Sequence, residues 1–217
     1  MNKEELFKIQ NNTTKVSIGN VLISEPFLND FYFKRSTILI IDHKEEEGSF
    51  GVIINKRLNI PFNEIVQGFP EFKADVYLGG PVETDRVFFI HTVGELIPDS
   101  YKIMSGLYWS GNINALKALI RTNLIKPHEV RFYIGYAGWD SGQLKKELKA
   151  NTWLVGKYSS KEILIEKIIL PQRNVSFSRG YFLHRRKVAC YLVSGADRQH
   201  AGACSCAKLE DNLPLAL

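Results

Sequence analysis

The sequence predicts an α+β protein with a curved or barrel-like, mostly antiparallel sheet flanked by helices. Many short apolar runs bounded by turn residues are typical of strands, and two stretches carry apolar residues at helical spacing. The regular strand–helix alternation of a doubly wound fold is absent. At 217 residues, 45% of them hydrophobic, the chain is long enough to bury a full core in one domain.

The apolar runs of the first half predict four strands and one short helix. Residues 16–24, 36–42, 50–54 and 74–78 have strand character, and residues 43–48 are polar enough to form a surface turn. Residues 59–69 permit a short helix with Ile60, Ile65 and Val66 on its apolar side and Pro61 in its first turn. Gly79, Gly80 and Pro81 then predict a turn that ends the fourth strand.

The middle of the chain predicts three strands and a capped helix. Residues 86–91 are apolar at their centre, and 101–104 and 107–109 are weaker strands around Gly106. Asn112 can cap a helix in which Ile113, Leu116, Leu119 and Ile120 share one stripe.

Residues 130–153 organise the prediction, because a strand, a turn, a helix and a return strand can each be read from them. Alternating apolar residues from Val130 to Tyr136 predict a strand with one apolar face. Asp140 and Gln143 have the spacing of a capping box, and Trp139 is placed to close over the helix that follows.

Charge is unevenly distributed along the chain. The formal net charge is +5, yet residues up to Glu166 hold 20 Lys and Arg against 20 Asp and Glu, whereas Lys167 to the end hold 8 against 3. A neutral body argues against direct nucleic-acid binding by the body, which needs a concentrated basic face.

Changes in charge and composition divide the chain into a polar arm (1–15), a main domain (16–165) and a basic tail (166–217). The tail holds Cys190, Cys204 and Cys206. A body without cysteines, a start without an apolar leader and the absence of membrane-length apolar runs predict a cytoplasmic protein with no membrane partner.

Six motifs in order resemble the bacterial AlgH/YqgE family, with a Bacteroidetes-like character. They are SEPFLNDF (24–31), STILIIDH (36–43), GVIINK (51–56), LGGPV (78–82), residues 106–108 and GYAGWDSGQLKKELKANTWL (135–154). The resemblance spans roughly residues 16–158. It implies a bifurcated pseudo-barrel sheet. It implies little about function, since the family has no agreed reaction and its label as a transcriptional regulator comes from association.

The tail departs from the family pattern after about Ser160. It is either an appended or out-of-frame segment or a real lineage-specific extension, and the lack of agreement among pattern, caps and turns favours the first. Poor packing is therefore predicted from Pro171 onward. His200, Cys204 and Cys206 are zinc-type ligands, but their spacing is not a paired knuckle, so neither a metal nor a cofactor is predicted.

The candidate site residues are His43, Asn55, Gly79, Gly80, Pro81, Trp139 and Gln143. Asp42 precedes His43 and three glutamates follow it, a pattern that fits acid–base chemistry, but its place in the predicted turn favours a solvated acidic loop. Asn55 can orient a ligand or tie a turn. The glycine pair can approach an anion, but no helix N-terminus follows, which favours a turn. Trp139 is better explained as a core residue and Asp140 as a helix cap than as ligand-binding residues.

Three functions remain open from the sequence. The preferred one is a binding or regulatory module for an unknown protein or small-molecule partner, with its contact residues at strand ends and turns. The alternative is a hydrolase-type enzyme on a small anionic substrate with His43 or His91 as general base. Direct DNA binding is the third, although Glu147 interrupts the basic face formed by Lys145, Lys146 and Lys149.

Overall fold

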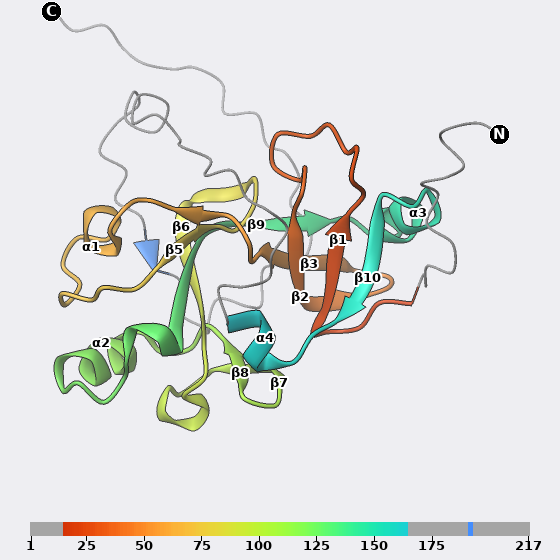
Figure 1. The fold of residues 1–217 in the computed structure, drawn as a ribbon. Coiled ribbons are helices and arrows are strands. Elements are labelled where there is room, and N and C mark those ends of the chain that lie inside the picture. The colour runs from red at the N-terminus through yellow and green to blue at the C-terminus, as the bar shows by residue number, and fades with distance from the viewer. Residues whose placement is uncertain (1–14, 165–190, 193–217) are drawn as a thin grey trace, which may run out of the picture.

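The computed structural model describes residues 15–164 and 191–192, and its central strand is β9, Val130–Trp139 (Figure 1). The first part of β9 lies between β5 (Val76–Leu78) and β6 (Val82–His91). Its last three residues pair instead with β3 (Gly48–Ile53). One strand therefore belongs to two sheets, which is the bifurcation that the family resemblance implies.

The remaining strands extend the two sheets outward in the order β10-β1-β2-β3-β9-β6-β8-β7, with β5 also on β9, β4 on β5 and β11 on β6. Their bounds are Asn20–Ser24 (β1), Thr37–Lys44 (β2), Arg57–Leu58 (β4), Tyr101–Met104 (β7), Leu107–Trp109 (β8), Trp153–Lys157 (β10) and Tyr191–Leu192 (β11). Only the β5–β9 and β11–β6 pairings in the described ranges are parallel. The path ends openly at β10 and β7, so the predicted mostly antiparallel α+β fold is confirmed but the sheet is not closed into a barrel.

Four α-helices flank the sheets: α1 Phe62–Ile65, α2 Ile113–Arg121, α3 Gln143–Lys149 and α4 Ser160–Leu164, with short 3-10 turns at Gly94–Leu96 (η2) and Pro127–Glu129 (η3). Figure 1 shows α2 and α3 at opposite ends of β9. The Asn112 side chain accepts hydrogen bonds from the backbone N–H groups of Asn114 and Ala115, as the predicted cap requires. The first helix is shorter than predicted, and it buries Phe62 rather than Ile60.

Strand β9 is buried on both faces, which corrects the prediction of one apolar face. Arg131 and Tyr133 alternate with the apolar residues and are buried with them, because sheets and helices cover β9 from both sides. The guanidinium of Arg131 lies 4.9 Å from the centre of the Tyr77 ring. It donates to the carbonyl of Ile163 at 2.9 Å and to that of Leu164, so it closes the C-terminal end of α4. The sequence analysis did not predict α4, although Ser159 and Glu162 have the spacing of a capping box, and each side chain accepts the other residue's backbone N–H.

The turn before α3 differs in detail from the predicted capping box. The Gln143 side chain does accept a hydrogen bond from the Asp140 backbone N–H at 3.0 Å. The helix, however, starts from Gly142 in the left-handed conformation (φ 69°) and receives no side-chain cap. The Asp140 carboxylate is therefore not the cap. Leu144 and Leu148 are buried and Lys145, Lys146 and Lys149 are exposed, as predicted.

Three clusters of buried side chains fill the body. One lies among α1, α2 and the N-terminal part of β9, with the rings of Phe62 and Phe132 stacked 3.8 Å apart. A second lies among β2, β3, β8 and α4. The third joins β1, β2 and β10 to α3 through Trp139 and Trp153.

Predictions for the arm and tail fall almost entirely outside the described residues. This applies to residues 1–14, to the poor packing predicted from Pro171, and to the ligand types His200, Cys204 and Cys206. The described exception is the pair Tyr191–Leu192, whose backbone runs parallel to β6 at Arg86 and Val87.

Candidate functional site

Strand register brings His43, Ser49 and Trp139 into one row across β2, β3 and β9. His43 pairs with Ser49, and Ser49 pairs with Trp139. His43 lies inside β2 rather than in the turn, which consists of Glu45, Glu46 and Glu47. The predicted position of His43 in a solvated acidic loop is therefore wrong, because β2 runs to Lys44, two residues beyond the predicted strand end at residue 42.

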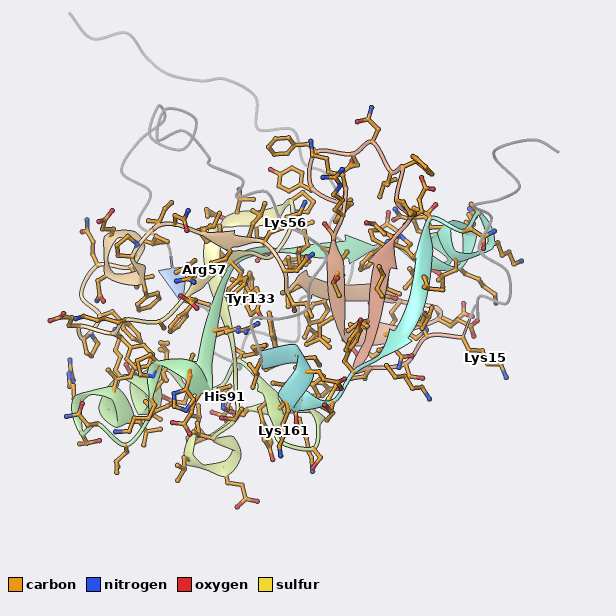
Figure 2. All side chains as sticks on the ribbon, viewed as in Figure 1. Lys15, Lys56, Arg57, His91, Tyr133 and Lys161 are labelled. Atoms are coloured by element: carbon orange, nitrogen blue, oxygen red, sulfur yellow. The ribbon has the colours of Figure 1, made fainter. Side chains whose placement is uncertain are left out.

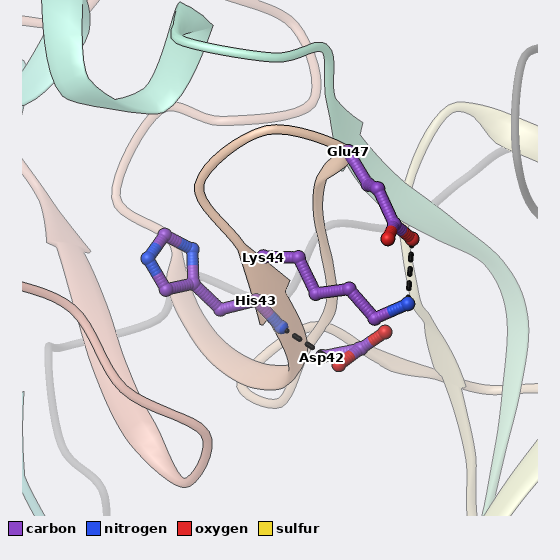
Figure 3. A network of polar contacts seen from close by, with 4 residues as sticks. All are labelled: Asp42, His43, Lys44 and Glu47. Atoms are coloured by element: carbon purple, nitrogen blue, oxygen red, sulfur yellow. Dashed lines mark hydrogen bonds and ion pairs between the residues drawn. The ribbon is translucent and has the colours of Figure 1, made fainter.

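The imidazole of His43 is half-buried and held by one short contact. Its Nδ1 lies 2.7 Å from the Ser49 hydroxyl oxygen. The Asp42 carboxylate accepts the backbone N–H of His43 at 3.0 Å and does not bind the ring. Figure 3 shows the ring pointing away from Asp42 and from the Lys44–Glu47 ion pair. In the described part of the chain, Nε2 has no protein hydrogen-bond partner.

A shallow depression lies beside this imidazole, between the β2–β3 turn and the start of α3. Its lining comprises His43, Lys44, Glu45, Gly48, Ser49, Asp140, Gly142, Leu144 and Lys145. Glu45 connects the two walls, since it accepts a hydrogen bond from Lys145 at 2.8 Å. That contact lowers the pKa of Glu45 and raises the pKa of Lys145. Both groups are exposed, so the pair orients the walls more than it stabilises the fold.

The two other candidates of this region, Trp139 and Gln143, do not line the depression but hydrogen-bond to Glu147 in the adjoining helix α3. The indole N–H groups of Trp139 and Trp153 both donate to Oε2 of Glu147, at 2.8 and 2.7 Å. Gln143 donates to Oε1 of the same carboxylate at 2.9 Å. Glu147 therefore fixes the β9–α3 corner. Its i, i+4 spacing from Gln143 was the available signal in the sequence.

Asn55 lies at the other end of β2. Its carbonyl accepts the Thr37 N–H at 2.9 Å and its amide donates to the Arg35 carbonyl at 3.0 Å. Thr37 precedes His43 by six strand residues, or about 20 Å. His43 and Asn55 thus do not line one concave site, and Asn55 closes the loop between β1 and β2.

Gly79 and Gly80 lie in the predicted turn, where the chain reverses between β5 and β6, and both are also required there for close packing. A Cβ on Gly79 would meet the Gly135 carbonyl oxygen at 2.1 Å, and one on Gly80 would meet the Tyr136 backbone at 2.2 Å. Gly79 also joins the sheets, because its N–H donates to Ile134 and its carbonyl accepts from Ile53, both at 2.8 Å. Pro81 is exposed. The LGGPV motif therefore has a structural explanation.

A comparison with known families decides the relationship that the six motifs suggest. A family model described as AlgH-like matches residues 21–173, which is more than half of the chain. The chain belongs to the AlgH-like family. Relatives agree: a UPF0301 protein of Bacteroides thetaiotaomicron is 47% identical over 154 residues, covering 70% of this chain and 78% of that protein. One from Parabacteroides distasonis is 43% identical over 163 residues, covering 74% and 82%.

Two solved structures share the AlgH-like fold. The crystal structure of DIP2367 from Corynebacterium diphtheriae superposes with a TM-score of 0.59 at 24% identity, covering 76% of this chain and 87% of that one. The solution structure of AlgH from Pseudomonas aeruginosa gives 0.57 at 25% identity, covering 72% and 85%. These likenesses support the fold, and the names of these two proteins state no reaction.

His91 in this AlgH-like chain is a core residue (Figure 2). Its Nε2 lies 2.9 Å from the Ser110 carbonyl oxygen and 3.0 Å from the Ser100 hydroxyl, and its ring stacks on Tyr108. Burial lowers the pKa of His91 to about 4. The ring is neutral and sealed from solvent, so the prediction that it acts as a general base has no structural support.

Lys56 is a functional candidate that was not among the predicted site residues, although it is the last residue of the GVIINK motif. Its amine is half-buried and donates to the Tyr32 carbonyl in the β1–β2 loop. Burial, followed by repulsion from Lys34, lowers the pKa of Lys56 to about 8. A depressed lysine pKa marks functional candidates, and only the environment in the fold could have revealed it.

No three His, Cys, Asp or Glu side chains gather as a metal site within residues 15–164. Within the same range, no helix has the length and apolar character needed to cross a membrane.

Proposed function

We propose that this AlgH-like chain is a binding module with a regulatory role, and that its contact site is the depression beside His43. The bound group is a small polar molecule or a polar side chain of a partner protein. The observation that carries the proposal is the 2.7 Å contact between His43 and Ser49, which holds a half-buried imidazole in one orientation at the depression.

The surrounding charges support the same proposal. Lys44 and Lys145 each pair with a glutamate, and Asp140 adds a carboxylate to the lining. A ligand can exchange with these exposed pairs at little cost, because solvent screens surface ion pairs and they contribute little to stability. The imidazole and the serine hydroxyl supply orienting hydrogen bonds, so a polar ligand with both donor and acceptor groups fits the site.

A hydrolase remains the second candidate because of the same contact. A serine hydroxyl within hydrogen-bond reach of an imidazole is the minimum of a nucleophile and base pair. The pair lacks the third group that orients a catalytic histidine, since the Asp42 carboxylate accepts a backbone N–H instead. Binding therefore fits the geometry better than hydrolysis does.

The test is an NMR titration of the ¹⁵N-labelled full chain with small carboxylates, phosphates, amines and amino acids. Saturable shifts at the amides of His43, Ser49 and Gly142 are expected, with loss of those shifts in His43→Ala. The matched control is His128→Ala, because His128 is exposed in η3 at the opposite end of β9. It should bind as the wild type does.

A photo-crosslinking residue at Lys44 tests the protein-partner arm, with the same residue at Lys126 as its control. Partner capture at Lys44 that disappears in His43→Ala supports a protein ligand. If no probe shifts the depression and Lys44 captures no more than Lys126, the binding proposal is wrong. Esterase or phosphatase turnover that Ser49→Ala abolishes would establish the hydrolase instead.

A further inference from the structure

Two consecutive residues after β3, Asn55 and Lys56, hydrogen-bond to the loop between β1 and β2. Asn55 bridges the Thr37 N–H and the Arg35 carbonyl, and Arg35 has a left-handed φ of 53°. Lys56 reaches the Tyr32 carbonyl, which also accepts the Ser36 hydroxyl at 2.9 Å. The loop conformation therefore depends in part on one lysine amine.

This loop presents two large apolar side chains. Phe27 is 67% exposed and Phe31 is 62% exposed. The turn that carries Phe31 is organised by Asp30, whose carboxylate accepts the backbone N–H groups of Tyr32 and Phe33 at 2.8 Å. Loss of the hydrogen bond between Lys56 and the Tyr32 carbonyl would therefore affect the turn that exposes Phe31.

We propose that Lys56 is a modification site that accepts an acyl group from an activated carboxylic donor, such as an acyl phosphate or an acyl thioester, and that acylation loosens the β1–β2 loop. The neutral amine attacks the carbonyl carbon of the donor and forms an N–C bond. The C–O or C–S bond breaks, the phosphate or thiolate leaves with the electron pair, and the amine proton passes to water.

The geometry explains why this amine differs from the other described lysines. Burial disfavours the charge of this amine most, the Lys34 ammonium disfavours it further, and the Asp30 carboxylate favours it, while the Tyr32 carbonyl accepts its hydrogen bond. With a pKa of about 8, about a quarter of the amine is neutral at pH 7.5. An ordinary lysine with a pKa near 10.5 is neutral in about one molecule per thousand.

Acylation would weaken the contact with Tyr32. The ammonium makes a charge-assisted hydrogen bond, and an amide N–H is about half as strong a donor. The acyl group must also occupy space beneath the loop. Asn55 remains in place, so the expected change is local opening of residues 30–36 rather than unfolding.

The experiment treats the purified full chain with acetyl phosphate between pH 7 and pH 10 and measures acetylation at each lysine by mass spectrometry. Lys146 and Lys149, both exposed on α3, are the internal references. At pH 7.5, Lys56 should react at least about fivefold faster than these references, and the ratio should fall toward one as the pH rises. Equal or slower reaction of Lys56 at pH 7.5 would overturn the proposal.

Two further measurements separate reactivity from mere exposure. Lys34→Ala removes a repulsive charge and should slow labelling of Lys56, whereas Lys73→Ala, also at an exposed lysine, should not. Amide exchange in residues 32–36 should be faster in the acetylated protein than in Lys56→Arg, which keeps a charged donor. Labelling unchanged by Lys34→Ala, or exchange unchanged by acetylation, would each contradict the proposal.

Discussion

Replacement of Glu147 by alanine should destabilise the protein more than most single substitutions. Its Oε2 accepts the indole N–H groups of both Trp139 and Trp153, whose side chains are 6% and 2% exposed. Each hydrogen bond to a charged acceptor contributes about 1.5–3 kcal/mol. Glu147 is itself only half-buried, so water can partly replace it, and we expect a loss of about 3 kcal/mol for the pair.

Glu147→Gln should cost about half as much, because one acceptor oxygen remains. The loss in Glu147→Ala corresponds to a fall in Tm of about 6–12 °C for a chain of this length. Urea denaturation followed by circular dichroism measures the free energy of unfolding. The indole N–H signals of Trp139 and Trp153 should shift in the variant, while that of Trp109 should not.

The matched control is Glu71→Ala, an exposed glutamate for which a change within about 0.5 kcal/mol is expected. A loss below about 1 kcal/mol for Glu147→Ala, with unshifted indole signals, would refute the shared-acceptor argument.

Three other perturbations have clear expected outcomes. The pKa of His91 is about 4 in the folded protein and near 6.5 in the unfolded chain, so the unfolded chain binds more protons between these pH values. The free energy of unfolding should therefore fall by about 2 kcal/mol from pH 7.5 to pH 5. Urea unfolding of His91→Phe should show no such pH dependence. Gly80→Ala would place a Cβ 2.2 Å from the β9 backbone and should cost more than about 2 kcal/mol in thermal unfolding, whereas Gly138→Ala, whose Cβ would lie 3.4 Å from its nearest neighbour, should cost less. Asn112→Ala removes the α2 cap and should cost about 1 kcal/mol in urea unfolding, whereas no such loss is expected for Asn114→Ala at the exposed helix surface.

Local pattern was sufficient for most elements of the fold. Strand pairs such as 101–104 and 107–109 and the helix capped by Asn112 appear where alternation and capping chemistry place them. The strand β9 was predicted, but its single apolar face was not confirmed, because a strand shared by two sheets buries polar side chains such as Arg131 that normally mark a solvent-exposed face. Burial of that kind depends on partners distant in the sequence.

The candidate site was less accessible to sequence reasoning. His43 and Trp139 are brought into one row by strand register, and register depends on pairings that no short motif contains. Asn55 belongs to the same set of motifs, but its amide binds the backbone at the far end of β2. Family motifs therefore mix residues that build the fold with residues that can meet a ligand.

The anchoring of α4 by Arg131 has a consequence for how sequences of this kind can diverge. The guanidinium grips main-chain oxygens of residues 163 and 164, and every amino acid supplies such an oxygen. The hydrogen bond from Arg131 to residue 164 thus does not depend on which side chain residue 164 carries. The sequence after Leu164 can therefore change during evolution without loss of the contact between Arg131 and α4.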